Sequence, residues 1–421
     1  MEKLAPRLNG TATLRLWDGT ELPLGPDPVD GLYLSISSPG VVGTLLRWPT
    51  AHNLLKQFAQ GHIGFEGADL YTVIRALRDP AKRKGGTKLG RLEAVRALLP
   101  FLLASAPKDP LQHQFEGEST GRGRQQSANV DFVQFHYDLS DDFFALFLDQ
   151  QMVYTCAYFT DETKNLNEAQ IAKLDHICRK LRLQPGDRFL DIGFGWGGLL
   201  IHAAQKYGVK AHGITLSENQ HRYVTERIAQ LKLEDQVSVE VVDYADMQGE
   251  YDKVASICMY EHVGIDRLGG FMQKVNSIMA AEGVFLLQGI TRPAKATMKQ
   301  FRKLNAERRL LAKYIFPGGE LDHLGHMIQT MEYSGFEVSD VEGWRNHYIR
   351  TCQLWCRRLY DNREAAIELV GPARYNLYQL YLAGCALAFE DGGARIYQVV
   401  AEKHKRRQPS VAPLTREHLY S

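Results

Sequence analysis

The fold is decided by the stretch FLDIGFGWGGLL, which runs from Phe189 to Leu200. Its apolar first half is typical of a buried strand, and its second half begins the helical pattern GWGGLLIHAAQKYG (195–208). Gly193, Gly195 and Gly198 follow the spacing G-x-G-x-x-G between strand and helix, and such glycines let a ligand approach the backbone. The stretch therefore predicts a nucleotide-type site at the switch point of a doubly wound sheet.

The charge around this loop favours one kind of ligand. Asp191 precedes the first glycine, and the second strand ends in GITLSENQ (213–220), with no acid at the strand tip. A dinucleotide site places a pyrophosphate over the helix N-terminus and an acid at the end of the second strand. Asp191 disfavours that anion but suits the sulfonium and ammonium groups of S-adenosylmethionine. The sequence favours S-adenosylmethionine over NAD, and a packing loop without any ligand stays as the alternative.

Strands alternate with helices around this loop. The expected strands are 187–193, 210–216, 237–243, 253–260 and 283–290, and the expected helices are 166–183, 196–207, 217–232 and 268–281. This alternation predicts a parallel sheet with helices on both faces. Asp243 and Tyr244 end the third strand, where we expect them to flank the adenine of the cofactor.

Eight motifs occur in order along the chain. They are HYDLSDDFFALFLD (136–149), YTCAYF (154–159), EAQIAKLDHICRKL (168–181), LDIGFGWGG (190–198), GITLSENQ (213–220), MYEHVG (259–264), YIFPGGEL (314–321) and GCALAFEDG (384–392). Together they resemble the cyclopropane-fatty-acid synthases and the mycolic acid cyclopropane synthases, strongly over 130–404. The resemblance implies a class I methyltransferase fold, an α/β Rossmann-like seven-stranded sheet with ARIYQVVAEK (394–403) as its antiparallel last strand. It also implies S-adenosylmethionine as cofactor and action on cis double bonds in lipid acyl chains.

The length and composition bound the domain organisation. A chain of 421 residues exceeds one ordinary core. We predict a small N-terminal α+β domain for lipid docking or dimerisation at 1–105, a linker at 106–130, the methyltransferase domain at 131–408 and a tail at 409–421. The net charge of +1 gives no argument for nucleic acid, and six scattered cysteines without a C-x-x-C pair predict no metal site. Free thiols, no secretion signal and no run of 18 apolar residues predict a cytoplasmic protein.

The resemblance implies a set of cofactor contacts. Tyr154 and Thr155 should contact the methionine end, while Thr215 and Gln220 should bind the ribose, which removes the need for an acid at that strand tip. The complete implied set is Tyr154, Thr155, Asp191, Gly193, Gly195, Trp196, Gly197, Thr215, Leu216, Ser217, Gln220, Asp243 and Tyr244.

The reaction implied by the resemblance makes its own demands on the site. Attack of an alkene on the sulfonium methyl leaves a carbocation, and loss of a proton from the new methyl closes the ring. The site must exclude water and tolerate a cation, and aromatic faces suit a cation. The aromatic candidates are Tyr137, Phe144, Tyr158, Phe159, Tyr260, Phe316 and Tyr348, although any of them also suits an ordinary core.

The family's base is a bound bicarbonate ion, and its ligands map onto this chain. The resemblance implies the backbone of Cys156, the carboxylate of Glu261, the backbone N–H of Ile290 and the hydroxyl of Tyr348. The fifth ligand is a histidine in the family and Gln288 here. An amide still donates hydrogen bonds but cannot become cationic near neutral pH. Either bicarbonate is retained and rings close, or the base is weakened and a methyl-branched or methylene product forms. A core amide without a catalytic role is the third interpretation.

Access to acyl chains predicts contact with a membrane. Residues 291–316 carry eight Lys or Arg against one acid, interleaved with apolar residues, which suits an anionic membrane surface or equally a solvated helix packed inward. We expect a peripheral protein on the inner face of the membrane, a homodimer, phospholipid acyl chains as partners, and a reductase or another fatty-acid-modifying enzyme beside it. Alternative functions are methylation of a soluble small molecule and non-catalytic lipid binding.

Overall fold

The computed structural model describes residues 10–78, 99–105, 140–160, 165–303, 320–403, 409–410 and 412–420. Their contacts divide into two units. The smaller unit contains the described residues up to 105 together with 352–384, and the larger unit contains the rest. The predicted linker at 106–130 lies outside the described residues, so the domain boundaries stay a prediction.

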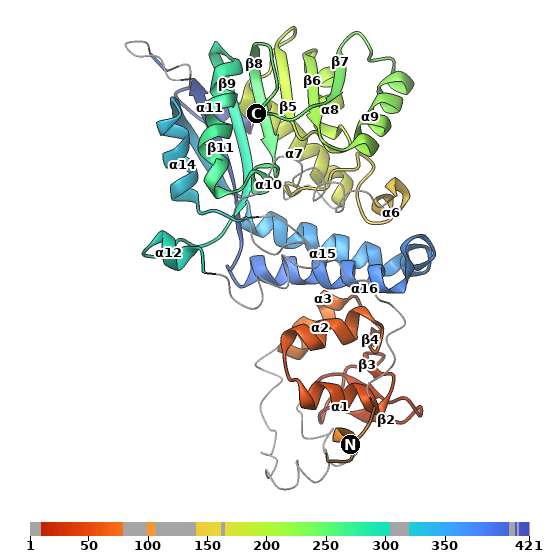
Figure 1. Cartoon of the computed structure of the whole chain (residues 1–421). Helices are drawn as coiled ribbons and strands as arrows, with labels where there is room; N and C mark the ends of the chain where they lie inside the picture. The colour runs from red at the N-terminus through yellow and green to blue at the C-terminus, as the bar shows by residue number, and fades with distance from the viewer. Residues whose placement is uncertain are drawn as a thin grey trace. The chain divides into compact units, whose positions relative to one another are not determined.

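The larger unit is built on one seven-stranded sheet (Figure 1). Its strands are β5 (Arg188–Ile192), β6 (Lys210–Thr215), β7 (Val237–Val241), β8 (Tyr251–Ile257), β9 (Met279–Thr291), β10 (Phe336–Gly343) and β11 (Arg395–Lys403). They lie in the order β10-β11-β9-β8-β5-β6-β7. Neighbours from β9 to β7 pair in parallel, and β11 is antiparallel to both β9 and β10. The predicted doubly wound sheet with an antiparallel last strand is confirmed.

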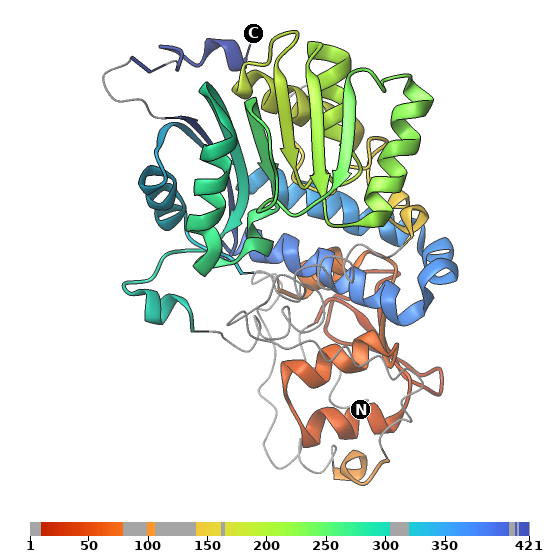
Figure 2. The same cartoon turned by 45° about the horizontal axis from the view of Figure 1, so that its top comes forward.

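Helices cover both faces of this sheet, as Figure 2 shows. One core joins the sheet to α7 (Leu166–Leu181), α8 (Gly198–Tyr207) and α9 (Glu218–Leu231), and the other joins it to α11 (Leu268–Ile278) and α14 (Leu324–Tyr333). Successive side chains of β9 point to opposite faces of the sheet and so contribute to both cores. Val284 and Leu286 face the first core, and Phe285 and Leu287 face the second.

Three predicted boundaries in this unit were wrong. The helix expected to end at 281 ends at Ile278, and β9 begins at the next residue. The strand expected to reach 260 ends at Ile257, because Cys258 has a positive φ of 55° and α10 (Tyr260–Val263) follows. In the predicted basic helix 291–316, Thr291 still belongs to β9 and α12 spans only Met298–Phe301, while 304–316 lie outside the described residues.

The smaller unit is an α+β assembly, as predicted. Its four strands lie in the order β2-β1-β3-β4, and they are β1 (Thr13–Arg15), β2 (Glu21–Pro23), β3 (Tyr33–Ile36) and β4 (Ile63–Glu66). Its helices include α1 (Pro39–Arg47), α2 (Ala51–Ala59) and α3 (Leu70–Arg78). A hairpin joins β1 to β2, with Gly19 at a φ of 82° in its turn.

Residues 352–384 of the smaller unit come from parts of two long helices. They are α15 (Arg345–Asp361) and α16 (Arg363–Glu390), and α16 is kinked where Gly371 takes a φ of 78° before Pro372. Gln353 donates from Nε2 to the Tyr71 hydroxyl at 2.7 Å, which ties this segment to the N-terminal elements. No helix among the described residues is both long and apolar enough to cross a bilayer.

Candidate active site

The glycine loop after β5 requires its glycines. Gly193, Gly195 and Gly197 have φ values of 83°, 57° and 79°, a region that side chains disfavour. The Gly193 N–H donates to the Ile214 carbonyl at 2.8 Å. A Cβ on Gly197 would lie 2.9 Å from both methyl carbons of Val224. The loop therefore leads into α8 along a path that side chains disfavour, most strongly at Gly197, where both the backbone angle and Val224 oppose a Cβ.

Asp191 is a buried carboxylate just before this loop. Its Oδ1 has no hydrogen-bond partner, and it is 3% exposed. Burial raises its pKa to about 7, and the ammonium of Lys173 opposes that rise. An unpartnered buried carboxylate beside an open glycine loop is suited to a cationic ligand.

Lys173 on α7 is a site residue that the sequence analysis missed. Its Nζ donates to Thr155 Oγ1 at 2.9 Å, and burial lowers its pKa to about 8. The nearby carboxylates of Asp149 and Asp191 oppose this shift, and the effect of Asp149 is the larger. The sequence does contain a signal that could have identified Lys173, since a lysine stands there next to the apolar stripe of an amphipathic helix.

An aromatic and acidic cluster packs on the glycine loop. Asp141, at the start of α6 (Asp141–Ala145), accepts hydrogen bonds from Trp196 Nε1 at 2.8 Å and Asn219 Nδ2 at 3.0 Å. The ring of Phe144 lies 4.7 Å from Trp196 and 5.3 Å from Tyr154. The described part of the HYDLSDDFF motif thus supports two of the predicted cofactor residues.

The predicted ribose and adenine residues meet at the carboxyl ends of β6 and β7. Thr215 Oγ1 donates to Gln220 Oε1 at 2.8 Å, and both side chains are buried. Ser217 caps α9 by accepting the Gln220 N–H at 3.3 Å, and Leu216 lies between them, half-buried. Asp243 and Tyr244 follow β7, half-buried, and the ring of Tyr244 stands edge-on to Phe271 at 5.1 Å. This set can hydrogen-bond a ribose and flank a base.

Glu261 and Ile290 are brought together by the neighbouring strands β8 and β9. Glu261 Oε1 accepts the Ile290 N–H at 2.6 Å, while Oε2 is buried without a partner. Burial raises the pKa of Glu261 to about 7, and the hydrogen bond from Ile290 opposes that rise. Tyr260 donates its hydroxyl to the Ile290 carbonyl at 2.8 Å. Glu261 can therefore exist in either protonation state near neutral pH.

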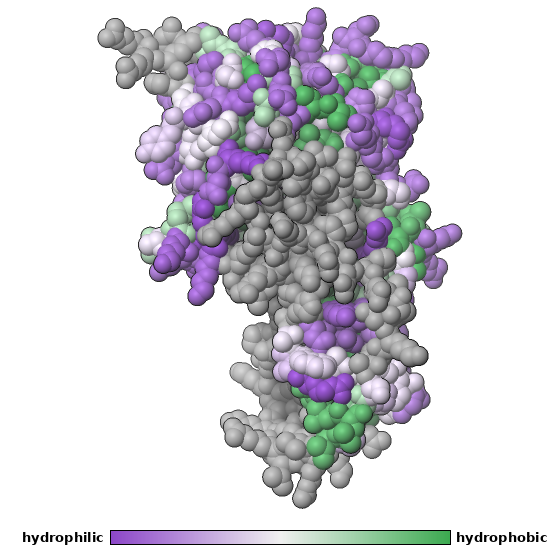
Figure 3. All heavy atoms as spheres, viewed as in Figure 1, coloured by the Kyte–Doolittle hydropathy of each residue, from purple (hydrophilic) through white to green (hydrophobic). Residues whose placement is uncertain are grey.

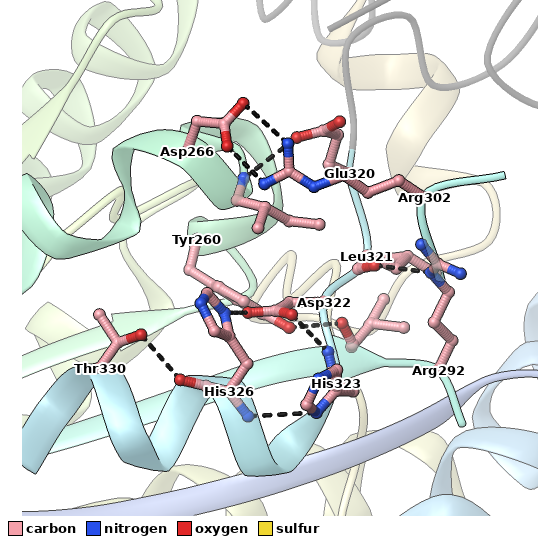
Figure 4. A network of polar contacts seen from close by, with 12 residues as sticks. Tyr260, Asp266, Arg292, Arg302, Glu320, Leu321, Asp322, His323, His326 and Thr330 are labelled. Carbon is pink, nitrogen blue, oxygen red and sulfur yellow. Dashed lines mark hydrogen bonds and ion pairs between the residues drawn. The ribbon is translucent and has the colours of Figure 1, made fainter. Parts of the chain in front are cut away.

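A second network, drawn in Figure 4, fixes the backbone around Glu261. The Glu320 N–H donates to the Glu261 carbonyl at 3.0 Å, and Glu320 Oε2 accepts the Ile265 N–H at 3.0 Å. Arg292 donates from its backbone N to the carbonyl of Asp322, whose carboxylate contacts His326 Nδ1 at 2.6 Å. The chain that follows the undescribed segment 304–319 is thereby attached next to the site.

Gln288 is held by two side chains. Its Oε1 accepts a hydrogen bond from Gln398 Nε2 at 2.8 Å, and its Nε2 donates to Cys258 Sγ at 3.5 Å. Gln288 and Gln398 are register partners on β9 and β11, and both are fully buried. The Cys258 N–H donates to the Gln288 carbonyl at 2.8 Å. Sequence reasoning missed Gln398 and Cys258, although Gln398 interrupts an apolar strand just as Gln288 does.

The YTCAYF motif is attached to the start of α15. The Ala157 N–H donates to Thr351 Oγ1 at 3.1 Å, and Cys156 is fully buried with its Sγ 3.9 Å from the Trp344 carbonyl. Tyr158 stacks on His176 at 4.6 Å and on His347 at 4.7 Å.

The remaining aromatic candidates have different outcomes. The Phe159 N–H donates to His347 Nδ1 at 3.0 Å, and the buried ring of Tyr348 lies 4.6 Å from Phe389. Tyr137 and Phe316 lie outside the described residues. Over the described part of the chain, no group of three or more His, Cys, Asp or Glu side chains is arranged to hold a metal ion.

Comparisons with known proteins show the family of this chain. The mycolic acid cyclopropane synthetase family matches residues 124–399. A probable fatty acid methyltransferase of Pseudomonas putida is 34% identical over 415 residues, 97% of this chain and 95% of the relative. The solved cyclopropane synthase MmaA2 from Mycobacterium tuberculosis is 35% identical with a TM-score of 0.62, over 65% of this chain and 98% of that one.

A further solved relative was crystallised with a cofactor product. The mycolic acid cyclopropane synthase CmaA1, complexed with SAH and CTAB, is 36% identical with a TM-score of 0.61, over 65% of this chain and 98% of that one. The fold, the glycine loop and these likenesses agree. This chain therefore belongs to the mycolic acid cyclopropane synthetase family and is an S-adenosylmethionine-dependent C-methyltransferase.

Proposed function

We propose that this enzyme transfers a one-carbon unit from S-adenosylmethionine to a cis double bond of an unsaturated phospholipid acyl chain and forms a cyclopropane fatty acid, with bicarbonate as the base. The observation that carries the proposal is the pair of buried carboxylates with unpartnered oxygens, Asp191 Oδ1 at the glycine loop and Glu261 Oε2 at the end of β8. The first suits a cationic cofactor and the second suits a proton-bearing anion. The likeness to a probable fatty acid methyltransferase supports an acyl substrate.

The residues on the cofactor side would act by binding and orientation. When bound, S-adenosylmethionine supplies an electrophilic methyl carbon. Asp191 would balance its positive charge, and the Thr215–Gln220 pair would open its hydrogen bond to engage the ribose hydroxyls. The packing of Phe144 between Tyr154 and Trp196 would hold the methionine end in place and keep water out.

The residues around Glu261 suit a bicarbonate ion. When bound, bicarbonate supplies a base for the final proton loss. Gln288 Nε2 offers a donor hydrogen, since its current acceptor is only a thiol sulfur at 3.5 Å, a weak acceptor. Glu261, with a pKa of about 7, can accept the proton that bicarbonate carries. The Ile290 N–H now donates to Glu261 Oε1 and would be shared with, or released to, the anion.

One specific observation favours a second candidate. Gln288 cannot hold a positive charge, so it stabilises an anion less than a protonated histidine would. If bicarbonate binds too weakly, the carbocation is resolved by another route. A hydride shift followed by loss of a proton from the methyl group gives a methylene fatty acid, and direct loss of a proton from the chain gives an unsaturated methyl-branched fatty acid. Gln288 also already accepts a hydrogen bond from Gln398, so its amide is less free to reorient around an anion.

We also propose that the enzyme works as a peripheral protein at the cytoplasmic face of a membrane, as a homodimer, and that a reductase or another fatty-acid-modifying enzyme acts with it. Exposed apolar side chains of the smaller unit support lipid contact, and Figure 3 shows hydrophobic surface on this unit. The exposed large apolar side chains of its described residues are Val29, Trp48, Leu54, Leu99, Leu102, Leu103 and Leu369, of which Leu103 is 89% and Trp48 58% exposed. Singly exposed apolar residues are common, but seven in one small unit are suited to a lipid surface.

Expression in a host that makes unsaturated phospholipids but has no synthase of its own tests the proposal. Mass spectrometry of the fatty acids should find chains one carbon heavier with a ring. Methyl-branched or methylene chains would support the second candidate. Glu261→Ala is the matched control and should yield neither. The absence of any heavier chain from a folded enzyme that binds S-adenosylmethionine would refute action on phospholipids.

A further inference from the structure

We propose that Gln398 is a positioning residue that fixes the orientation of the Gln288 amide and makes Gln288 an obligatory hydrogen-bond donor. The inference rests on the proposed function, because it concerns the same anion site. Gln398 Nε2 donates to Gln288 Oε1 at 2.8 Å, and both side chains are fully buried. The two residues lie directly opposite each other on β9 and β11.

A free amide at position 288 would be ambiguous toward an anion. Glutamine carries a carbonyl acceptor and an NH₂ donor that exchange places when the side chain flips. The donor face attracts an anion and the acceptor face repels it. In this site the hydrogen bond from Gln398 occupies the carbonyl, and the NH₂ group is directed at Cys258 Sγ, 3.5 Å away.

The surroundings make the flipped state unfavourable. A flip of Gln288 alone would bring the NH₂ groups of Gln288 and Gln398 together, lose one hydrogen bond and leave a buried donor unpaired. A joint flip of both amides would restore that bond, but it would place the Gln398 NH₂ group where its Oε1 now lies buried without a partner, and so it would also leave a buried donor unpaired. Such a loss favours the observed orientation by about tenfold or more.

The backbone keeps this geometry in place. Cys258 holds a φ of 55° and donates its N–H to the Gln288 carbonyl at 2.8 Å, so the sulfur stays opposite the amide. Gln398 Oε1 is buried and has no hydrogen-bond partner. Gln398 therefore donates from its NH₂ group to Gln288, and its carbonyl oxygen can accept a hydrogen bond from a neighbouring proton-bearing group.

The test measures bicarbonate binding without turnover. The full chain is held in carbon dioxide-depleted buffer with S-adenosylhomocysteine, and the rise in Tm with added bicarbonate gives its Kd. We expect Gln398→Met to weaken bicarbonate binding by about tenfold, with S-adenosylhomocysteine affinity unchanged. Gln398→Asn, which keeps the amide but is too short to reach Gln288, should give the same loss, and it decides the matter if the Met variant does not fold.

A matched control and a double mutant separate positioning from general stability. Gln379, in the smaller unit, is a buried glutamine whose Nε2 donates to the Cys356 carbonyl at 3.2 Å. Gln379→Met should lower Tm yet leave the bicarbonate Kd unchanged. In a Gln288→Met background, Gln398→Met should have no further effect on that Kd, because Gln398 acts on bicarbonate only through the Gln288 amide.

The outcomes distinguish a failure of the proposed bicarbonate base from a failure of the proposed role of Gln398. If bicarbonate does not raise the Tm of the wild-type enzyme, the proposed bicarbonate base is wrong and the role of Gln398 fails with it. If the wild-type enzyme responds and Gln398→Met and Gln398→Asn respond equally well, only the role of Gln398 is wrong. Additive losses in the double mutant would also overturn it.

Discussion

Glu261→Gln should make the protein more stable while it abolishes the reaction, and the gain should depend on pH. Glu261 is 3% exposed, and burial raises its pKa from 4.5 to about 7. Between these values the folded protein holds a proton that the unfolded chain has released, so the free energy of unfolding falls as pH rises through this window. The shift of about 2.5 pKa units corresponds to roughly 3 kcal/mol above pH 7.

The substitution removes the ionisation but keeps the shape. The amide carbonyl can still accept the Ile290 N–H that Glu261 Oε1 accepts now at 2.6 Å. We expect Glu261→Gln to match the wild-type stability near pH 4.5 and to exceed it by up to about 3 kcal/mol at pH 8. Urea unfolding of the full chain at pH steps between 5 and 8.5 measures the difference.

Glu332→Gln provides the control, because Glu332 lies exposed on α14. It should leave both the stability and its pH dependence unchanged. A stability gain for Glu261→Gln that is equal at all pH values would show that burial of the charge is not its cause. A loss of stability at pH 8 would show that the carboxylate is paired in solution, and the description of the site would be wrong.

Three further changes test other parts of the site. Asp191→Asn should weaken S-adenosylmethionine binding by at least tenfold in calorimetry, because the cationic cofactor loses its opposite charge. The same substitution should raise the free energy of unfolding at pH 8, since burial raises the pKa of Asp191 to about 7. Lys173→Met removes the charge that opposes this rise, so half-maximal cofactor binding should move to higher pH. An unchanged binding profile would contradict the electrostatic influence of Lys173 on Asp191. Gly197→Ala combines a φ of 79° with a Cβ 2.9 Å from Val224 and should cost about 2–4 kcal/mol by urea unfolding, whereas Gly270→Ala, with no atom within 4 Å, should cost nothing.

The fold was predictable because its signals are local. The glycine loop and the apolar alternation depend on neighbours within one strand and one helix, so five strands and four helices of the larger unit followed from spacing. The seven-stranded sheet with its antiparallel last strand was implied by the family resemblance. The end of β8 was placed too late for a physical reason. Ile257 and Met259 continue the apolar run, but the left-handed backbone of Cys258 ends the strand before α10, and propensity rules seldom assign such a conformation to a cysteine.

The site was predictable only in part, because some of its contacts join distant segments. Asp191 and Gln288 could be singled out, since polar groups in apolar strands need partners, and Glu261 was implied by the family resemblance. The partners themselves lie far along the chain. Lys173 comes from the helix before β5, and Gln398 comes from a strand 110 residues after Gln288. Register between β9 and β11 decides which residue faces Gln288, and sequence patterns do not fix that register.

The partner also explains how a glutamine can occupy a histidine's place in this site. A neutral histidine has one donor nitrogen and one acceptor nitrogen, and a glutamine has a carbonyl and an NH₂ group. Gln398 donates to Gln288 Oε1 and could donate in the same way to the acceptor nitrogen of a neutral histidine, so the same residue can complete the hydrogen bonds of either side chain without any change in the strands. What the exchange removes is the capacity for positive charge. The consequence of Gln288 therefore lies in the electrostatics of the proposed anion site, and under the proposed mechanism the product depends on whether a fixed neutral donor holds bicarbonate as firmly as a chargeable one would.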